Sequence, residues 1–192
     1  MNKLKKKIWY LRTQILLKPY FRKIGKRSII LKPLQLDEVK SITIEDDVYI
    51  AENIWLMGND GFNETIRICE GTTIGHFAHI VAKNRVFIGK NVLIADRVFI
   101  SDCTHQYADI NVPIKKQRIE NIGDVNIGDE TWIGENVCVL GCSIGKHCVI
   151  GANSVVNKDI PDYTIAAGNP IRIIKKYNPV TNLWEKQNIN KV

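Results

Sequence analysis

Residues 86–100 read VFIGKNVLIADRVFI, and an isoleucine stands at every sixth position of this stretch, at Ile88, Ile94 and Ile100. Internal periodicity is examined before secondary structure, because a missed repeat misassigns the whole fold. The same period recurs on both sides, at Ile44, Ile50, Leu56, Phe62, Ile68, Ile74 and Ile80, then at Ile127, Ile133 and Val139, and again at Ile144, Ile150 and Val156. The hexapeptide is therefore the unit of the fold.

The positions beside these apolar residues also repeat. A glycine or another small residue often follows directly, as at Gly75, Gly89 and Gly128, and a small or β-branched residue often stands four positions later. β-Branched residues favour short strands, and glycine favours corners with positive φ or close backbone approach. Three hexapeptides, about 18 residues, then make one triangular coil whose apolar ladders lie inside. An all-β parallel β-helix is predicted, because residues 41–160 lack the long amphipathic helices of an α/β domain.

The period is interrupted most strongly between Ile100 and Ile127, where the chain reads CTHQYADINVPIKKQRIENIGDVN. This stretch is polar and contains Pro113, so we expect a loop over about residues 103–121 that projects from the prism. Loops on rigid scaffolds often carry the chemistry. The segment VLGCSIG shortens the repeat by one residue, which its two glycines can accommodate.

The repeat divides the chain into a basic arm (1–40), the β-helix (41–160) and a tail (161–192). In the arm, Ile8, Leu11, Ile15 and Leu16 fall near one helical face before Pro19. Two interpretations stay open: the helix packs on the prism or caps its first coil, or it lies on an anionic membrane surface. The tail is expected to run back over the coils and to end in a short helix.

Composition limits the function classes. The net charge of +7 arises in the first 36 residues, which carry eleven Lys or Arg and no acid, whereas the remainder has 16 basic and 20 acidic residues. A nucleic-acid-binding body is therefore disfavoured. With no apolar run of 18 residues and no secretory signal pattern, we expect a cytoplasmic protein, with the inner membrane face as an additional location. The five cysteines form no C-x-x-C pair, and most of them are interpreted as small buried hydrophobic residues.

The segments VNIGDETWIGENVCVL, SIGKHCVIGANSVVNKDIPDYTIAAGNPIRIIKK and SDCTHQYADINVPI resemble hexapeptide acyltransferases. The resemblance is to maltose and galactoside O-acetyltransferases and to bacterial polysaccharide O-acetyltransferases, and it covers about residues 40–176. It implies a left-handed winding, which the usual right-handed crossover rule does not predict. It also implies acetyl-CoA as cosubstrate without a metal, a saccharide acceptor in surface-polysaccharide synthesis, and a homotrimer.

The resemblance assigns His105 as the general base, because an imidazole can take the proton of a sugar hydroxyl and return it to the departing thiolate. It aligns Glu120 with the partner that orients this ring. For the cofactor it implies Gly134, Ala152, Asn157, Lys158, Arg172 and Lys175, with Lys176 as a further candidate, and for the acceptor it implies Asp102 and Trp132. A covalent route through Cys103 stays open beside direct transfer.

Two other functions were weighed. A metalloenzyme resembling γ-type carbonic anhydrases needs three converging histidines, whereas His76 and His79 lie only three positions apart and are interpreted as structural. His147 has no evident partner. A non-catalytic scaffold is disfavoured by the joint presence of His105, Glu120 and the basic tail. The sugar and its hydroxyl are not specified by the sequence.

Overall fold

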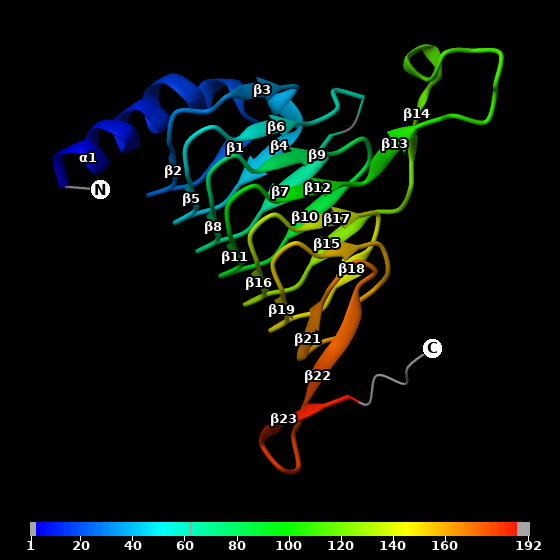
Figure 1. Ribbon diagram of the computed structural model, residues 1–192. Coiled ribbons are helices and arrows are strands. Elements are labelled where there is room, and N and C mark those ends of the chain that lie inside the picture. Colours follow the sequence, from blue (N-terminus) through cyan, green and yellow to red (C-terminus); the bar gives the residue numbers. More distant parts are fainter. Residues whose placement is uncertain (1–2, 62, 188–192) are drawn as a thin grey trace.

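The computed structural model describes residues 3–61 and 63–187, and these form a three-sided prism of parallel strands with one helix at its N-terminal end (Figure 1). Phe62, which the repeat placed in a ladder, lies outside the described residues. Sheet A contains β1 (Lys23–Ile24), β4 (Ile42–Ile44), β7 (Ile66–Ile68), β10 (Val86–Ile88), β15 (Val125–Ile127) and β18 (Ser143–Ile144). The predicted parallel β-helix is confirmed.

The other two sides are built in the same way. Sheet C contains β3 (Gln35–Asp37), β6 (Trp55–Met57), β9 (His79–Val81), β12 (Phe99–Ser101), β17 (Cys138–Leu140) and β20 (Val155–Val156). Sheet B contains β2 (Ile29–Ile30), β5 (Tyr49–Ile50), β8 (Thr73–Ile74), β11 (Leu93–Ile94), β16 (Trp132–Ile133), β19 (Val149–Ile150), β21 (Thr164–Ala167), β22 (Arg172–Asn178) and β23 (Leu183–Lys186). Each strand is short because a coil turns a corner every few residues.

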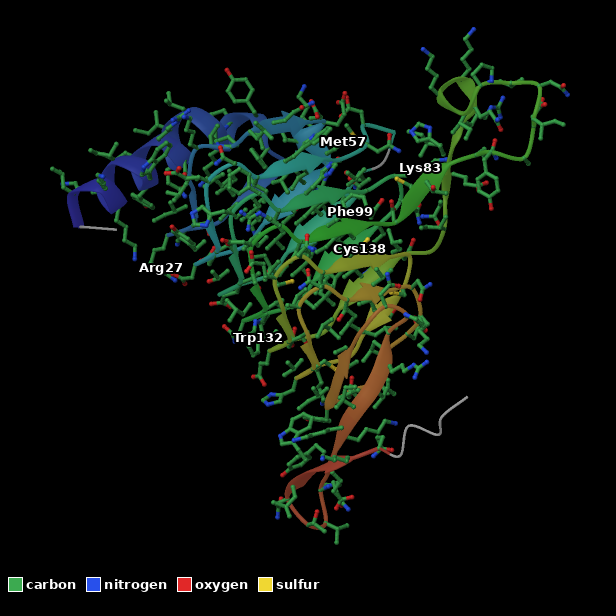
Figure 2. All side chains as sticks on the ribbon, in the orientation of Figure 1. Arg27, Met57, Lys83, Phe99, Trp132 and Cys138 are labelled. Atoms are coloured by element: carbon green, nitrogen blue, oxygen red, sulfur yellow. The ribbon has the colours of Figure 1, made fainter. Side chains whose placement is uncertain are left out.

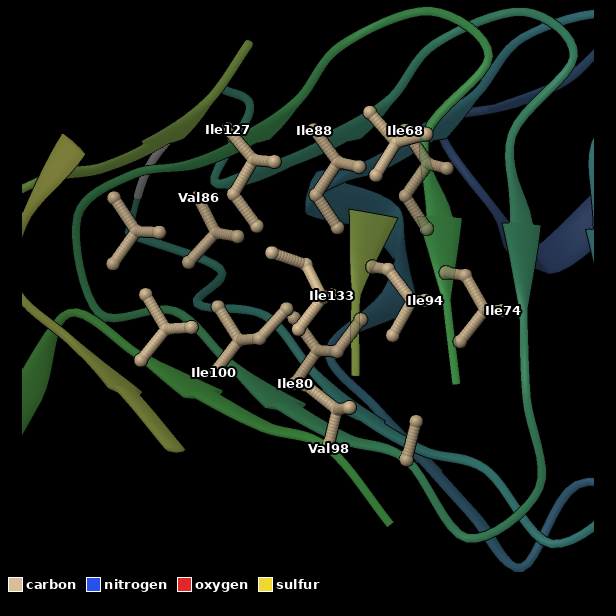
Figure 3. Close-up of a cluster of buried hydrophobic side chains, with 14 of the residues drawn as sticks. Ile68, Ile74, Ile80, Val86, Ile88, Ile94, Val98, Ile100, Ile127 and Ile133 are labelled. Carbon is tan, nitrogen blue, oxygen red and sulfur yellow. The ribbon is translucent and has the colours of Figure 1, made fainter. Parts of the chain in front are cut away.

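The repeat positions fill the interior of the prism. Ile68, Ile88 and Ile127 are in register on sheet A, and all three are fully buried. Figure 3 shows this row beside the rows that contain Ile94 and Ile100 from the other two sheets. Because each apolar side chain contacts its equivalents in the coils above and below, the hexapeptide period is the direct sequence record of a close-packed core.

All variation in coil length falls at one corner, between sheet C and sheet A. The steps from sheet A to B and from B to C are six residues in each coil, as in Ile88, Ile94 and Ile100. The steps from C to A are instead of different lengths: 8 for Leu36–Ile44, 12 for Leu56–Ile68, 8 for Ile80–Ile88, 27 for Ile100–Ile127 and 5 for Val139–Ile144. We call this edge of the prism the variable corner.

The glycines that follow the ladder residues serve close approach rather than positive φ. A Cβ on Gly89 would lie 2.8 Å from the Asp129 amide nitrogen of the next coil. The positive φ values at the corners fall instead on residues such as Asn91 (52°) and Asn136 (58°). Asparagine adopts this conformation more readily than most residues, because its short side chain bonds locally.

The two ends of the chain differ from expectation. The first coil begins at Lys23, within the region that the sequence assigned to the arm, because β1 pairs with β4. At the other end, β22 pairs antiparallel with both β21 and β23, so the tail extends sheet B as a hairpin. The expected C-terminal short helix is wrong for the described residues. No helix among the described residues has the length and apolar character needed to cross a membrane.

Candidate active site

A two-stranded ribbon projects from the variable corner after β12 (Figure 1). It consists of β13 (Cys103–His105) and β14 (Ile119–Asn121), which pair antiparallel, and its tip carries a 3₁₀ turn at Ile114–Lys116. His105 is the last residue of β13, and its side chain is exposed. The predicted extruded loop therefore exists, and it presents the candidate base to solvent on a short, hydrogen-bonded support.

His105 and Glu120 lie on opposite faces of this ribbon. The register pairs His105 with Ile119 and Thr104 with Glu120. Paired residues of antiparallel strands share a face and successive residues alternate, so the imidazole and the carboxylate point apart. Glu120 accepts a hydrogen bond of 3.1 Å from Nε2 of Gln106 instead. The expectation that Glu120 orients the imidazole directly does not fit this structure.

Asp102 fastens the ribbon to the prism rather than facing an acceptor. Its side chain is fully buried. One carboxylate oxygen accepts from the amide of Lys83 (2.7 Å), and the other accepts from the amides of Asn84 (2.6 Å) and Arg85 (2.7 Å). The predicted acceptor-binding role of Asp102 is wrong, because a carboxylate surrounded by three backbone donors has no face left for a sugar.

Lys83 is a site residue that the sequence analysis missed. Its backbone binds Asp102, and its Nζ donates to the carbonyl of Ile119, the residue that pairs with His105. Figure 2 shows Lys83 at the base of the ribbon. No sequence motif identifies this lysine. It follows β9, and it reaches the ribbon after β12 only because the two coils stack, with Ile80 in register with Ile100, 20 residues later.

Cys103 is unsuited to act as a ready nucleophile. Burial raises the pKa of its thiol, so the thiolate is disfavoured near neutral pH. The Oγ of Ser101 lies 3.5 Å from its Sγ, and the Ser101 hydroxyl also donates to the Cys103 carbonyl. These contacts place the cysteine in the support of the ribbon and favour direct transfer over a covalent route.

The other three histidines occupy the outer surface of the prism. Nδ1 of His76 lies 3.2 Å from Asp96, and Nδ1 of His147 lies 3.2 Å from Glu130. The His79 ring stacks on Trp55 with centroids 4.0 Å apart, and burial lowers its pKa. Within residues 3–61 and 63–187, no three His, Cys, Asp or Glu side chains form a group that could hold a metal ion.

The residues expected to contact the pantetheine arm lie at another corner, between sheets B and C. Gly134 is buried, and a Cβ there would lie 2.7 Å from the Ala152 amide nitrogen, so this glycine is required by coil stacking itself. Ala152 is exposed at the matching turn of the next coil. Trp132, 49% exposed, lies on the outer face of sheet B beside its register partner Leu93. Figure 2 shows Trp132 far from the ribbon.

The polar cofactor candidates fall into two groups. Asn157 and Lys158 are exposed where the last coil leaves β20, at the same variable corner as His105 but two coils further along. Arg172 and Lys175 lie on β22, where they pair with Ala167 and Ile165. Arg172 is exposed and Lys175 is half-buried. One chain therefore distributes the predicted site residues over two corners and the C-terminal hairpin.

Comparisons with known proteins agree with this architecture. The family described as bacterial transferase hexapeptide (six repeats) matches residues 124–158. Galactoside O-acetyltransferase of Escherichia coli K12 is 33% identical over 149 residues, which cover 76% of this chain and 72% of that protein. WbbJ of the same organism, named for O-acetyl transfer in lipopolysaccharide biosynthesis, is 43% identical over 125 residues, 61% of this chain. That alignment spans 63% of the length of WbbJ.

A solved structure shows the same fold at low identity. A mutant of AntD, an N-acyltransferase from Bacillus cereus, superimposes with a TM-score of 0.71 at 21% identity, over 88% of this chain and 91% of that one. AntD was crystallised with coenzyme A and dTDP-4-amino-4,6-dideoxyglucose. At this identity the likeness supports the parallel β-helix alone.

Proposed function

Because the chain belongs to the bacterial hexapeptide acetyltransferases, we propose that it transfers an acetyl group from acetyl-CoA to a sugar hydroxyl. The observation that carries the proposal is the position of His105. Its side chain is exposed on the β13–β14 ribbon, which projects from the variable corner of the β-helix. The galactoside O-acetyltransferase likeness supports a hydroxyl acceptor, and the WbbJ likeness supports an acceptor in surface-polysaccharide synthesis.

In this proposal His105 acts as the general base. The imidazole removes the proton of the acceptor hydroxyl while its oxygen attacks the thioester carbonyl carbon. Collapse of the tetrahedral intermediate breaks the C–S bond, and the imidazolium returns the proton to the departing thiolate. The ester C–O bond replaces the thioester, so no covalent enzyme intermediate is needed.

Glu120 acts on the imidazole indirectly, through Gln106, and not by the direct contact that the sequence predicted. The Glu120 carboxylate accepts from the side chain of Gln106, the residue that follows His105. The backbone amide of Gln106 donates to the Arg118 carbonyl across the ribbon at 2.8 Å. Together with Lys83, which holds the Ile119 carbonyl, these contacts set the direction in which the ribbon presents the imidazole. Glu120 is therefore a positioning residue in the proposed mechanism.

Cationic side chains supply the proposed binding groups for the phosphates of coenzyme A. Arg172 and Lys175 on β22, with Lys176 beside them, form a basic end of sheet B, and Lys158 adds a charge at the variable corner. Charge-assisted hydrogen bonds to phosphate are about twice as strong as neutral ones. Asn157 and Ala152 are proposed to contact the neutral pantetheine arm, and Trp132 stays a proposed acceptor contact.

We propose that the complete site forms between chains of a homotrimer. His105 lies at the corner between sheets C and A, and Ala152 lies at the corner between sheets B and C. In a trimer, the Ala152 corner of one chain can lie against the His105 corner of its neighbour. The outer face of sheet C is suited to such contact, because Trp55, His79 and Phe99 form an aromatic row on it. Cyclic closure of this contact gives three equal sites.

Release of free coenzyme A tests the proposed reaction. The purified protein is supplied with acetyl-CoA and, in separate reactions, with free sugars, nucleotide sugars and lipid-linked sugars, and thiol formation is followed. Acceptor-dependent thiol release with recovery of an acetylated sugar is expected in one group. Acetyl transfer to amino sugars alone, or thiol release without an acetylated sugar, contradicts an O-acetyltransferase.

A further inference from the structure

The N-terminal helix is attached to the prism by a face that combines half-buried Trp9 and Leu17 with the polar Thr13 and Gln14. The Oγ1 of Thr13 accepts from the Ile30 amide (2.9 Å), and its one hydroxyl proton is shared between the carbonyls of Trp9 (2.9 Å) and Ile30 (3.2 Å). Nε2 of Gln14 donates to the carbonyls of Gly25 and Ser28. Thr13 is fully buried by this contact. These bonds satisfy backbone groups at the open end of the first coil, so the segment caps the prism.

The opposite face of the helix carries an exposed apolar stripe. Within α1 (Lys3–Arg12) and the π-helical turn η1 (Thr13–Leu17), the stripe comprises Leu4, Ile8, Leu11 and Ile15, which are 68%, 55%, 44% and 64% exposed. Their spacings of four, three and four residues place them on one face. Thr13 follows Leu4 by nine residues, about 2.5 helical turns, so the stripe points away from the prism.

The helix thus carries apolar residues on both of its sides, because Trp9, Tyr10 and Leu17 are half-buried on the side of Thr13, and Leu17 packs against the core. An ordinary surface helix buries its apolar stripe against the core and exposes its polar face. The four aliphatic side chains of the stripe, in contrast, have no contact of this kind and face solvent. An exposed apolar surface of this kind marks a contact with a partner or a membrane. Capping of the first coil, expected from the sequence, explains the face that contacts the prism. It does not explain the exposed apolar stripe.

Charge identifies the occupant. Lys7, Arg12 and Lys18 border the stripe, and the first 36 residues contain eleven Lys or Arg without an acid. The Arg12 guanidinium lies over the Trp9 ring at 4.8 Å, so its charge stays beside the stripe. A second copy of this helix would bring like charges together. An anionic bilayer instead offers an apolar interior below a negative surface, which matches both properties.

We propose that α1 and η1 bind an anionic membrane surface, with Leu4, Ile8, Leu11 and Ile15 inserted below the headgroups and the flanking cations at phosphate level. Because Thr13 and Gln14 fix the helix to the first coil, the prism is then held by its N-terminal end, with the C-terminal hairpin directed away (Figure 1). The proposal goes beyond acetyl transfer, and it favours acceptors that are themselves carried by a membrane.

Vesicle flotation tests the proposal with the full-length chain and without substrates, so its outcome is independent of the acetyltransferase assay. Vesicles of phosphatidylglycerol and of phosphatidylcholine are compared at low and high salt. The test variant combines Leu4→Ser, Ile8→Ser and Leu11→Ser. The matched control is Ile110→Ser with Val180→Ser, which removes two side chains that are 93% and 88% exposed elsewhere. Thermal melting establishes that both variants fold.

We expect phosphatidylglycerol vesicles to retain the wild type and the control, salt to weaken retention by screening, and the stripe variant to lose more than tenfold in partition coefficient. Quenching of a Leu11→Trp variant by brominated lipid gives an independent readout of insertion. Three results overturn the proposal: no retention at low salt, equal retention by phosphatidylcholine, or an unchanged coefficient for the stripe variant. If the stripe variant instead abolishes vesicle-independent self-association, the occupant is a second copy.

Discussion

The carboxylate of Asp102, the residue that precedes the projecting ribbon, accepts a hydrogen bond of 2.7 Å from the backbone amide of Lys83 in the preceding coil. The amides of Asn84 and Arg85 bind the same carboxylate. Three consecutive donors at one corner thus form a small anion site that the protein fills with its own side chain. The ribbon that carries His105 begins from this fixed point.

Asp102→Asn is expected to destabilise both the corner and the ribbon. An amide keeps one acceptor oxygen, but its NH₂ group must face at least one of the three backbone donors. We expect the free energy of unfolding to fall by about 1–3 kcal/mol, the cost of leaving a buried donor unpaired. Denaturant melts measure this change. Asp109→Asn is the control, because Asp109 is exposed and accepts one amide, from Asn111. Equal effects of the two substitutions contradict the role of Asp102.

His105→Ala is expected to lower the turnover number by on the order of 10² to 10⁴, the contribution of a positioned general base. The apparent Michaelis constant for acetyl-CoA should change little, since the imidazole meets the hydroxyl. The side chain is exposed on the ribbon, so thermal stability should be retained.

His147→Ala is the matched control for this substitution, because His147 is an exposed histidine at a corner remote from the ribbon and pairs with Glu130. Glu120→Gln should reduce turnover less than His105→Ala, since it weakens only the contact with Gln106. Near wild-type turnover of His105→Ala with its proper acceptor would remove this residue from the mechanism.

The combined variant Arg172→Ala, Lys175→Ala and Lys176→Ala should raise the Michaelis constant for acetyl-CoA much more than that for the acceptor. Loss of charged phosphate contacts is the cause. Steady-state kinetics with each substrate varied in turn gives both constants. The combination of Lys26→Ala, Lys32→Ala and Lys40→Ala controls for net charge, because these three lysines are exposed near the opposite end of the prism. An unchanged constant for acetyl-CoA excludes the hairpin from the cofactor site.

His79 should make the protein less stable at acidic pH. Burial beside Trp55 and Phe99 lowers its pKa in the folded state below the ordinary value of 6.5. The unfolded chain therefore binds the proton more tightly, and the free energy of unfolding falls as the pH drops from 6.5 towards the folded pKa. Chemical denaturation across pH 5 to 8, in His79→Phe beside the wild type, isolates this contribution. A variant with the same pH dependence as the wild type argues against it.

Light scattering should give three times the chain mass of 21.9 kDa if the homotrimer forms. A sharper test combines two inactive variants, His105→Ala and Ala152→Trp, which block the two different corners. Mixed trimers obtained by co-refolding should regain part of the activity, because some interfaces join two intact corners. A fully active monomer, or no recovery in trimers shown to be mixed, is incompatible with a site shared between chains.

The interior of the fold follows from the sequence because each buried ladder residue must repeat at the coil's own period. Ile88, Ile94 and Ile100 were predicted from spacing alone, and all lie in the core. The first coil carries the same signal at Ile24, Ile30 and Leu36, but the step of eight residues to Ile44 breaks its phase. The many basic residues around this coil are instead typical of a separate arm.

The relation between His105 and Glu120 could not be read from the chain. The resemblance to the acyltransferase family points to both residues, but the face on which each lies depends on the register of β13 and β14, and a shift of one residue reverses it. The contacts of Asp102 with the coil before it depend on stacking between distant segments. Likewise, residues 172–178 pair as a strand because β21 supplies an edge, which local sequence does not reveal.

All differences in coil length fall at the variable corner, so this edge of the prism tolerates insertions and deletions. A segment inserted there leaves the six-residue steps around the other two corners intact, so every ladder keeps its stacking. The entropic cost of a longer loop grows slowly, by about 0.6 kcal/mol for each doubling of length. This edge can therefore hold segments as different as a five-residue step and the whole ribbon that carries His105, while the remaining two edges keep the fold.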